Sequence, residues 1–520
     1  MKTYVHGILL AATLSLAVPL AGSAIAQESV LRVGAAYSDI TGLDPHKAPS
    51  GATIPVMSWI YGGLVRFTPG AADLERMEGD LAESWESSPD KLTWTFNLRK
   101  GVQFHRNFGE VTADDVVYSL TRAADPARSA HAATYAAIDS VRALDRYRVQ
   151  VRLKSGVPNF LVLVTNYHAG MIISAKADKD LGAAFNLNPV GFGPFEVVEL
   201  KKQNALFLKS FDRYFRGKPK IDRIEYRFLP SDANRELAFR SGEIDLYMGK
   251  REQVWVDRMR KQQDTIVEVF PHGDFRVLHL NQRMKPLDDR RVREAIALSI
   301  DREQLTKLQG DAVTVLGQTV IPYGYYGAAN GAWTLKPDIA RAKSLLAEAG
   351  YPNGLRVKAV ITSLPVLQAV MEAIQNQLKR SGIEVDVSVV DHAAYLAQIK
   401  ADQSGLVLYG AGRVPIADAY LSEFFHSRSQ IGAPGQMNNY SHCSVADKEI
   451  DAARSEPDKQ RQLAYWKVAQ EKIVADICGV PLFELLQVWV RSSKVDLGYK
   501  LQSSLFISPP ITEQTSIRGR

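Results

Sequence analysis

The strongest constraint on the fold is a regular alternation of strand-like and helix-like segments between residues 355 and 409. Three short apolar runs of strand length are separated by two segments with helical periodicity. In chain order they are strand 355–361, helix 365–380, strand 383–390, helix 393–401 and strand 406–409. Strands joined through helices in this way are parallel, with right-handed crossovers. The alternation therefore predicts an α/β fold with a parallel sheet in this part of the chain.

The carboxyl ends of these strands should share one edge of the sheet, which is where open α/β sheets bind ligands. Thr362 and Ser363 follow the first strand and precede a helix N-terminus, whose free N–H groups attract anions. Gly412 and Arg413 follow the third strand. We therefore expect an anion-binding edge. The alternatives are plain helix capping by the two hydroxyl residues and an Arg413 paired with a neighbouring acid such as Asp418.

The chain begins with a segment typical of a cleaved signal peptide, residues 1–26. A weakly basic start precedes the apolar run 8–20, and Ala24-Ile25-Ala26 forms a small-x-small cleavage site. The run is too short to span a bilayer comfortably, and no cysteine lies near the cleavage site to accept lipid. We expect a protein that is exported, cleaved and soluble, and not a lipoprotein.

The size and charge of the chain exclude little else. The 520 residues, less the first 26, suffice for two to four domains with large cores. A net charge of +6 over this length is mild, and no Lys/Arg run resembles a nucleic-acid or membrane patch. We expect no nucleic-acid partner.

The two cysteines, Cys443 and Cys478, flank two helical patterns at 445–454 and 458–475, with a turn at Glu456-Pro457. An antiparallel helical hairpin would bring its outer ends together. A disulfide then becomes geometrically reasonable in an exported chain. The alternative is two free, buried thiols.

Motifs of catalysis, metal binding and cofactor binding are missing from the sequence. No HExxH pair, Walker loop, Rossmann fingerprint or Gly-x-Ser-x-Gly elbow stands in its proper context. The acid pairs Asp114-Asp115 and Asp288-Asp289 both open helices, where carboxylates cap N–H groups. We expect no metal and no cofactor.

Residues 280–305, LNQRMKPLDDRRVREAIALSIDREQL, resemble the signature of the extracytoplasmic solute-binding proteins of peptide-type (dipeptide, oligopeptide and nickel) ABC importers, family 5. Further stretches match the same family in the same order along the chain: 81–105, 111–120, 191–197, 241–246 and 339–354. The sequence departs from the family pattern at Phe192 and at 105–109.

The resemblance implies a two-lobed periplasmic-binding-protein fold (type II, peptide-binding cluster) with an extra small α+β subdomain in the first lobe. The implied parts are lobe I at 27–67, 186–273 and 491–520, the extra subdomain at 68–185, and lobe II at 274–490. Such a protein captures a small-molecule solute between its lobes, works as a monomer in the periplasm and delivers the solute to an inner-membrane ABC permease. An exported hydrolase is the alternative class, and the lack of a nucleophile or metal motif argues against it.

Dipeptide-binding members carry an Asp just after the strand that matches 406–409, and it pairs with the ligand's ammonium group. Arg413 stands there in this sequence, or Gly412 if one residue is gapped. The resemblance therefore favours a ligand with an anionic group, with ordinary di- and oligopeptides as the alternative. The residues expected to contact the ligand are Arg413, Gly412, Thr362, Ser363, Tyr37, Ser38, Trp333 and Tyr409. The loop aromatics Tyr323, Tyr325 and Tyr326 could also pack on it, although each could equally be structural.

Overall fold

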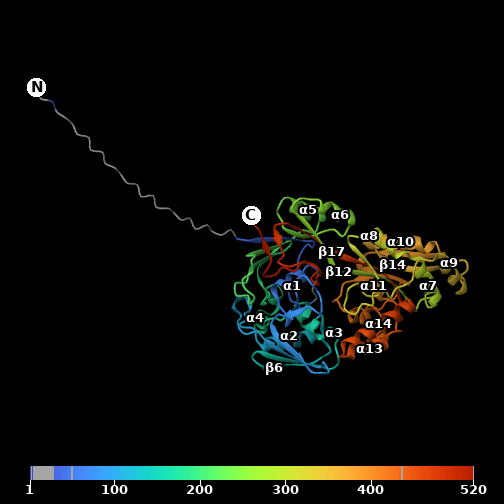
Figure 1. The fold of residues 1–520 in the computed structure, drawn as a ribbon, viewed down its shortest axis with the longest axis horizontal. Coiled ribbons are helices and arrows are strands. Elements are labelled where there is room, and N and C mark those ends of the chain that lie inside the picture. Colours follow the sequence, from blue (N-terminus) through green and yellow to red (C-terminus); the bar gives the residue numbers. More distant parts are fainter. Residues whose placement is uncertain (2, 4–27, 48–50, 435–436, 519–520) are drawn as a thin grey trace.

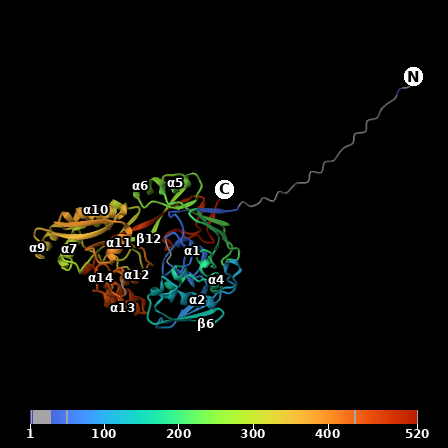
Figure 2. The same cartoon turned by 180° about the vertical axis from the view of Figure 1, so that it is seen from behind.

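The computed structural model describes residues 1, 3, 28–47, 51–434 and 437–518. The predicted signal peptide lies almost wholly outside the described residues. Two bodies stand side by side, one built from the N-terminal half with the C-terminal tail and the other from residues after about 275 (Figures 1 and 2). The long strands β12 (Thr265–Leu280) and β17 (Gly479–Ser492) run between them.

One eleven-stranded mixed sheet extends through both bodies. Its strands lie in the order β15-β14-β16-β12-β17-β11-β1-β10-β9-β8, and β13 pairs with β17 beside this path. The remaining bounds are β1 Val30–Ala35, β8 Phe195–Lys201, β9 Ala205–Ser210, β10 Arg223–Phe228, β11 Leu246–Met248, β13 Thr314–Leu316, β14 Leu355–Thr362, β15 Ile383–Val390 and β16 Leu406–Ala411.

The predicted alternation in the second body is confirmed. Strand β14 pairs in parallel with β15 on one side and with β16 on the other, and helices α10 (Pro365–Lys379) and α11 (His392–Lys400) connect them. Beyond β16 the sheet turns antiparallel, because β16 pairs with β12 in the opposite direction. The last parallel strand therefore lies directly against a strand that joins the two bodies.

The region predicted as an extra subdomain contains its own four-stranded antiparallel sheet, in the order β4-β5-β7-β6. Helix α2 packs against it, and a capping box of Thr112 and Asp115 opens this helix. The bounds here are β4 Ala82–Ser87, β5 Thr93–Leu98, β6 Ile138–Asp145, β7 Arg148–Leu153, α2 Ala113–Ala124, α3 Ala132–Tyr135 and α4 Ala175–Leu181.

Two separate hydrophobic cores show where the chain passes from one lobe to the other. Phe270 and Trp489 belong to the core of the first lobe, whereas Phe275 and Val488 belong to the core of the second. Strand β12 thus crosses within about five residues, where its pairing with β17 shifts register between Phe270 and Asp274. The lobe boundaries inferred from the resemblance stay predictions. Helix α6 (Gln253–Arg260), which precedes the crossing, contributes to the second core.

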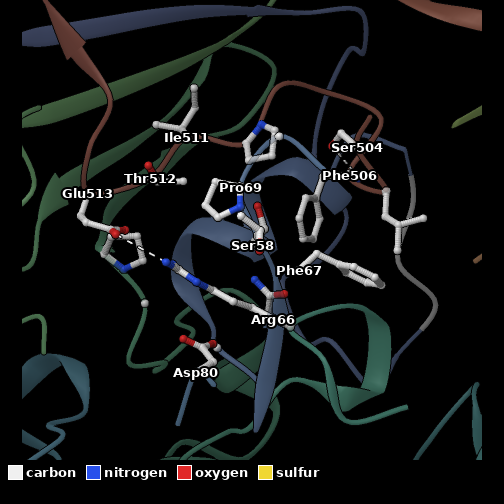
Figure 3. A pocket seen from close by; sticks show the side chains of 18 of the residues that line it. Ser58, Arg66, Phe67, Pro69, Asp80, Ser504, Phe506, Ile511, Thr512 and Glu513 are labelled. Carbon is white, nitrogen blue, oxygen red and sulfur yellow. Dashed lines mark hydrogen bonds and ion pairs between the residues drawn. The ribbon is translucent and has the colours of Figure 1, made fainter. Parts of the chain in front are cut away.

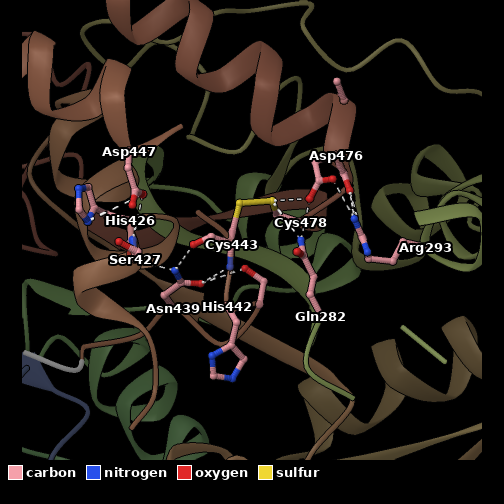
Figure 4. The surroundings of a disulfide bond; sticks show 12 residues. Gln282, Arg293, His426, Ser427, Asn439, His442, Cys443, Asp447, Asp476 and Cys478 are labelled. Atoms are coloured by element: carbon pink, nitrogen blue, oxygen red, sulfur yellow. Dashed lines mark hydrogen bonds and ion pairs between the residues drawn. A yellow bond between two sulfur atoms is a disulfide. The ribbon is translucent and has the colours of Figure 1, made fainter. Parts of the chain in front are cut away.

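A helical hairpin at the end of the second lobe carries a disulfide. Helices α13 (Asp447–Ser455) and α14 (Lys459–Asp476) pack together, and Cys443 and Cys478 are joined at a Cα–Cα distance of 5.7 Å. The Gln282 and Arg293 side chains bond the carboxylate of Asp476 at 2.9 Å (Figure 4). Of the two alternatives left by the sequence, the structure has the disulfide.

The other elements pack on these sheets and complete the two lobes. They are α1 Ile54–Ile60, β2 Val65–Phe67, β3 Met77–Gly79, α5 Asp232–Arg240, α7 Arg290–Ser299, α8 Arg302–Gln309, α9 Ile339–Glu348, α12 Ala417–Phe424, β18 Val495–Asp496 and β19 Ser516–Ile517, with 3-10 turns at His105–Asn107, Phe160–Val164, His168–Gly170, Gly182–Asn186 and Ser427–Ser429.

Candidate functional site

Arg413, the main residue singled out from the sequence, lies just beyond β16 and has a structural partner. Its Nε donates to Glu423 Oε2 at 2.6 Å, its Nη2 pairs with the other carboxylate oxygen, and its Nη1 donates to the carbonyl of Gly412. The proposed alternative, a structural ion pair, is therefore present, but Asp418 as its partner is wrong. Asp418 instead accepts a hydrogen bond from the hydroxyl of Ser422. Glu423, a little over one turn further along α12, is the acid that reaches Arg413. The Arg413 side chain remains 31% exposed.

A second charged cluster lies where β12 crosses between the lobes. Arg251 donates to Asp274 Oδ2 at 2.7 Å and to Gln487 at 2.7 Å, and Arg276 approaches the same Asp274 oxygen at 3.4 Å. Burial opposes ionisation of Asp274, but Arg251 and Arg276 outweigh it and lower the pKa of this carboxyl. The Asp274 side chain is still 35% exposed in the middle of the large sheet. The crossing therefore presents charged groups to an accessible space.

Glu484 on β17 faces this crossing from the other side. Its carboxylate accepts the backbone N–H of Gly273 at 2.7 Å, and the residue is 2% exposed. Burial raises the pKa of Glu484 to about 7, with Asp274 adding to the rise. Glu484 is therefore only partly ionised at neutral pH, and it offsets only part of the positive charge nearby.

The charges around the crossing sum to a positive value. Arg251, Arg276 and Arg413 contribute three cations, and Asp274 and Glu423 contribute two anions, so the balance is +1 before the partial charge of Glu484 is counted. A surplus of guanidinium over carboxylate favours an anionic ligand.

Tyr37 comes to this cluster from the first lobe, at the end of β1. Burial raises the pKa of its hydroxyl, which responds to the charges of Arg251 and Asp274. Ser38, the next residue, is exposed. The expectation that these two residues face the site stays a prediction, and the proximity of Tyr37 to the cluster agrees with it.

The Thr362-Ser363 pair is held by its own loop. Thr362 is buried, its hydroxyl accepts from the N–H of Leu364 at 3.3 Å, and His392 Nδ1 lies 3.2 Å from the same oxygen. Ser363 is exposed, and its N–H donates to Val390 across the sheet. Neither residue caps helix α10, whose N-cap is Leu364 without a side-chain cap hydrogen bond, so the capping alternative is wrong. A ligand role for the pair stays a prediction.

Two predicted aromatic contacts differ in their surroundings. Tyr409 is half-buried and packs against Tyr440 with ring centroids 5.0 Å apart. Trp333 is 7% exposed, donates to the carbonyl of Leu335 and is covered by Arg302 at 4.9 Å from its ring. Tyr409 thus lies beside Gly410 of β16, while the contacts of Trp333 are inside the second lobe.

A groove of about 670 Å³ runs between the lobes next to the charged crossing. His272, two residues before Asp274, and Pro415, two residues after Arg413, line it. Across the groove, Glu75 of the first lobe forms an ion pair with Lys459 of the second. The other lining residues are 71–74, Arg76, Pro271, Tyr323, Gly324, Tyr326, Gly327, Gln460, Leu463, Gln502 and Ser503. Of the three loop aromatics, Tyr323 and Tyr326 line the groove, and Tyr325 packs on His272.

A smaller cavity of about 50 Å³ lies within the first lobe (Figure 3). Arg66 crosses it, donating to Glu78 at 2.7 Å and lying 3.6 Å from Glu513 of the C-terminal tail. Asp80 and Tyr214 also line it. No sequence pattern indicated this cavity, because its walls come from segments more than 400 residues apart.

The resemblance placed the lobe crossings near 273–278 and 484–491, but the charges there were not singled out as site residues, although a signal existed. Asp274 and Arg276 flank Phe275 in the middle of a long strand, and Glu484 interrupts the apolar run 480–490. A charge at a position that should be buried is uncommon unless it is paired or functional.

No group of three or more His, Cys, Asp or Glu residues suited to a metal ion occurs in the ranges that the structure covers. Over the same ranges, no helix combines the length and apolar character needed to cross a membrane.

Two lobes joined by crossing strands, with a groove between them, are the architecture of proteins that bind a solute between their lobes. The model of bacterial extracellular solute-binding proteins, family 5 (Middle), matches residues 76–432, and the chain belongs to this family of ABC-importer binding proteins. The fold class inferred from the resemblance, the type II two-lobed fold, is confirmed.

Three relatives illustrate the likeness. The chain is 28% identical to the glutathione-binding protein GsiB of Pectobacterium atrosepticum, over 92% of this chain and 93% of GsiB. It is 44% identical to the solved structure of MoaA in complex with mannopinic acid, from A. tumefaciens R10, with a TM-score of 0.82 and coverage of 95% and 100%. It is 25% identical to AgaA of the same strain in complex with agropinic acid, with a TM-score of 0.76 and coverage of 94% and 99%.

Proposed function

We propose that this protein captures a small, amino-acid-derived solute with an anionic group between its two lobes and delivers it to an inner-membrane ABC permease. The observation that carries the proposal is the excess of guanidinium groups at the crossing. Arg251, Arg276 and Arg413 stand against Asp274 and Glu423, with Glu484 only partly ionised. A carboxylate on the ligand would balance this charge.

The position that binds an amine in dipeptide-binding relatives supports the same conclusion. Whichever alignment is used, Gly412 or Arg413 replaces the aspartate there. A free ammonium group would lose a charge-assisted hydrogen bond, which is worth about 1.5–3 kcal/mol. An arginine fork matches the two oxygens of a carboxylate instead.

The ligands of related proteins point the same way. MoaA is described in complex with mannopinic acid and AgaA in complex with agropinic acid, and both compounds are acids. At 44% identity over nearly the whole chain, MoaA is the nearer of these two relatives, and an opine-like acid is therefore the first ligand class to test.

We place the protein in the periplasm after cleavage near residue 26, acting as a monomer. Closure would be a hinge motion about β12 and β17, with ligand contacts on both lobes stabilising the closed form. The Glu75–Lys459 ion pair and the packing of Val414 against Phe67 and Leu505 of the first lobe are contacts that opening of the lobes would break.

Isothermal titration of the mature protein tests the ligand class. The panel contains mannopinic acid, agropinic acid, glutathione and dialanine. The protein is first unfolded and refolded to remove any co-purified solute. We expect one of the two opine acids to bind at least tenfold more tightly than dialanine, as the loss of one charge-assisted bond predicts. Tighter binding of dialanine would refute the anionic ligand and favour an ordinary peptide, for which Asp274 could receive the ammonium group.

A further inference from the structure

The side chain of Arg276 lies against Gly410 of strand β16, which has no side chain. We propose that Arg276, and not Arg413, is the main contact for the anionic group of the ligand, and that Gly410 determines specificity by leaving room for it. This inference rests on the proposed function and narrows it to one guanidinium.

The donors of the nearby arginines are used to different extents. Arg413 donates from Nε and Nη2 to Glu423 and from Nη1 to the carbonyl of Gly412. Arg251 donates from its two terminal nitrogens to Asp274 and Gln487. Within the part of the chain that the structure describes, Arg276 makes one hydrogen bond or ion pair, from Nη2 to Asp274 at 3.4 Å. Arg276 therefore keeps most of its five N–H donors for a ligand.

The strand register places Arg276 directly opposite Gly410. In the antiparallel pair β12–β16, Phe275 faces Ala411 and Arg276 faces Gly410. Opposite residues share a face of the sheet. Gly410 thus lies on the face that carries Arg276, while Ala411 lies on the other face.

The space at Gly410 is already filled by the arginine. A Cβ atom at this position would lie 2.2 Å from Nη1, 2.5 Å from Cδ and 2.6 Å from Cζ of Arg276. The backbone of Gly410 does not require glycine, because it is an ordinary strand residue without a positive φ. Glycine is therefore needed here for the position of Arg276. Any side chain would push the guanidinium away.

The environment of Arg276 also suits an anionic ligand. Its side chain is 13% exposed, enough to be reached from the space at the crossing. Burial lowers the pKa of this guanidinium, and Asp274 offsets only part of the effect. A carboxylate placed on Arg276 would supply the charge compensation that its surroundings provide only in part.

The test compares Gly410→Ala, Arg276→Gln and Arg413→Gln by isothermal titration with mannopinic acid and with its methyl ester. The control is Arg356→Gln, whose side chain on β14 is 72% exposed and pairs with Glu384. Circular dichroism melts check that each variant folds. Gly410→Ala should fold, because the atoms that it meets belong to the movable side chain of Arg276.

We expect Arg276→Gln and Gly410→Ala each to lose at least tenfold in affinity for the acid and to lose the preference for acid over ester. Arg413→Gln should lose less than either, and the control should bind like the wild type. Wild-type affinity in folded Gly410→Ala or Arg276→Gln, or a larger loss in Arg413→Gln, overturns the inference while the proposed function stands. A wild-type protein that binds acid and ester equally overturns the anionic-ligand proposal itself, and this inference with it.

Discussion

The buried Glu484 gives the protein a pH dependence that a single substitution should remove. Its pKa is raised to about 7 by burial, from an ordinary value of 4.5. Between pH 4.5 and 7 the folded protein therefore holds a proton that the unfolded chain has lost. Stability falls with rising pH wherever the native state binds more protons, so this residue should lower the stability across that interval. Above pH 7 the effect is constant.

The magnitude follows from the size of the shift. A difference of 2.5 pKa units corresponds to about 3 kcal/mol at 1.36 kcal/mol per unit. Glu484→Gln keeps an oxygen that can accept the N–H of Gly273 and removes the charge. The unfolded carboxyl is already mostly ionised at pH 5, so the variant should gain about 2 kcal/mol relative to the wild type at pH 8 compared with pH 5.

Urea unfolding of both proteins at pH 5 and pH 8 measures this difference. Other groups titrate in the same range, since burial lowers the pKa of His105 and His272 to about 4, but their effects are common to both proteins and cancel. Glu384→Gln, at a side chain 58% exposed, is the matched control and should show no such pH dependence. If the difference between wild type and Glu484→Gln is the same at both pH values, Glu484 is ionised normally and the reasoning is wrong.

Three further predictions concern contacts within and between the lobes. Cys443→Ser opens a loop closed at a separation of 35 residues and should cost about 4 kcal/mol in urea unfolding. Arg413→Leu leaves the buried Glu423 without its main partner and should cost about 2 kcal/mol, most of which Arg413→Leu with Glu423→Gln should recover. Glu75→Lys places two cations across the groove from each other at Lys459, and the radius of gyration of the ligand-free protein in small-angle scattering should increase.

Each of these has an outcome that contradicts it. A cost below about 1 kcal/mol for Cys443→Ser would mean that the disulfide does not restrain the unfolded chain. Equal stability of Arg413→Leu and of Arg413→Leu with Glu423→Gln would show that the unpaired Glu423 carboxylate is not what destabilises the single variant. An unchanged radius for Glu75→Lys, or one that the swap with Lys459→Glu fails to restore, would show that this pair does not hold the lobes together.

The sequence by itself determined the parts of this protein that local patterns encode. Periodicity set the order of strands and helices from β14 to β16 and their parallel direction, because strand–helix–strand units have few ways to pack. The helical hairpin predicted between Cys443 and Cys478 was enough to make a disulfide reasonable, since two antiparallel helices bring their outer ends close together. The family followed from motifs spread over nearly the whole chain.

Only the tertiary structure decided which charges meet. Arg413 is paired with Glu423 and not with Asp418, because the turn of α12 sets which acid lies beneath the arginine. Arg251 meets Gln487 across 236 residues, and Arg276 reaches Gly410 across the sheet. Periodicity states which face of an element is buried, but it does not state which distant segment will cover that face. For this reason the sequence predicted an anion site at the edge of the sheet next to β16, with Arg413 as the main contact. The contacts in the structure led us to propose Arg276 instead.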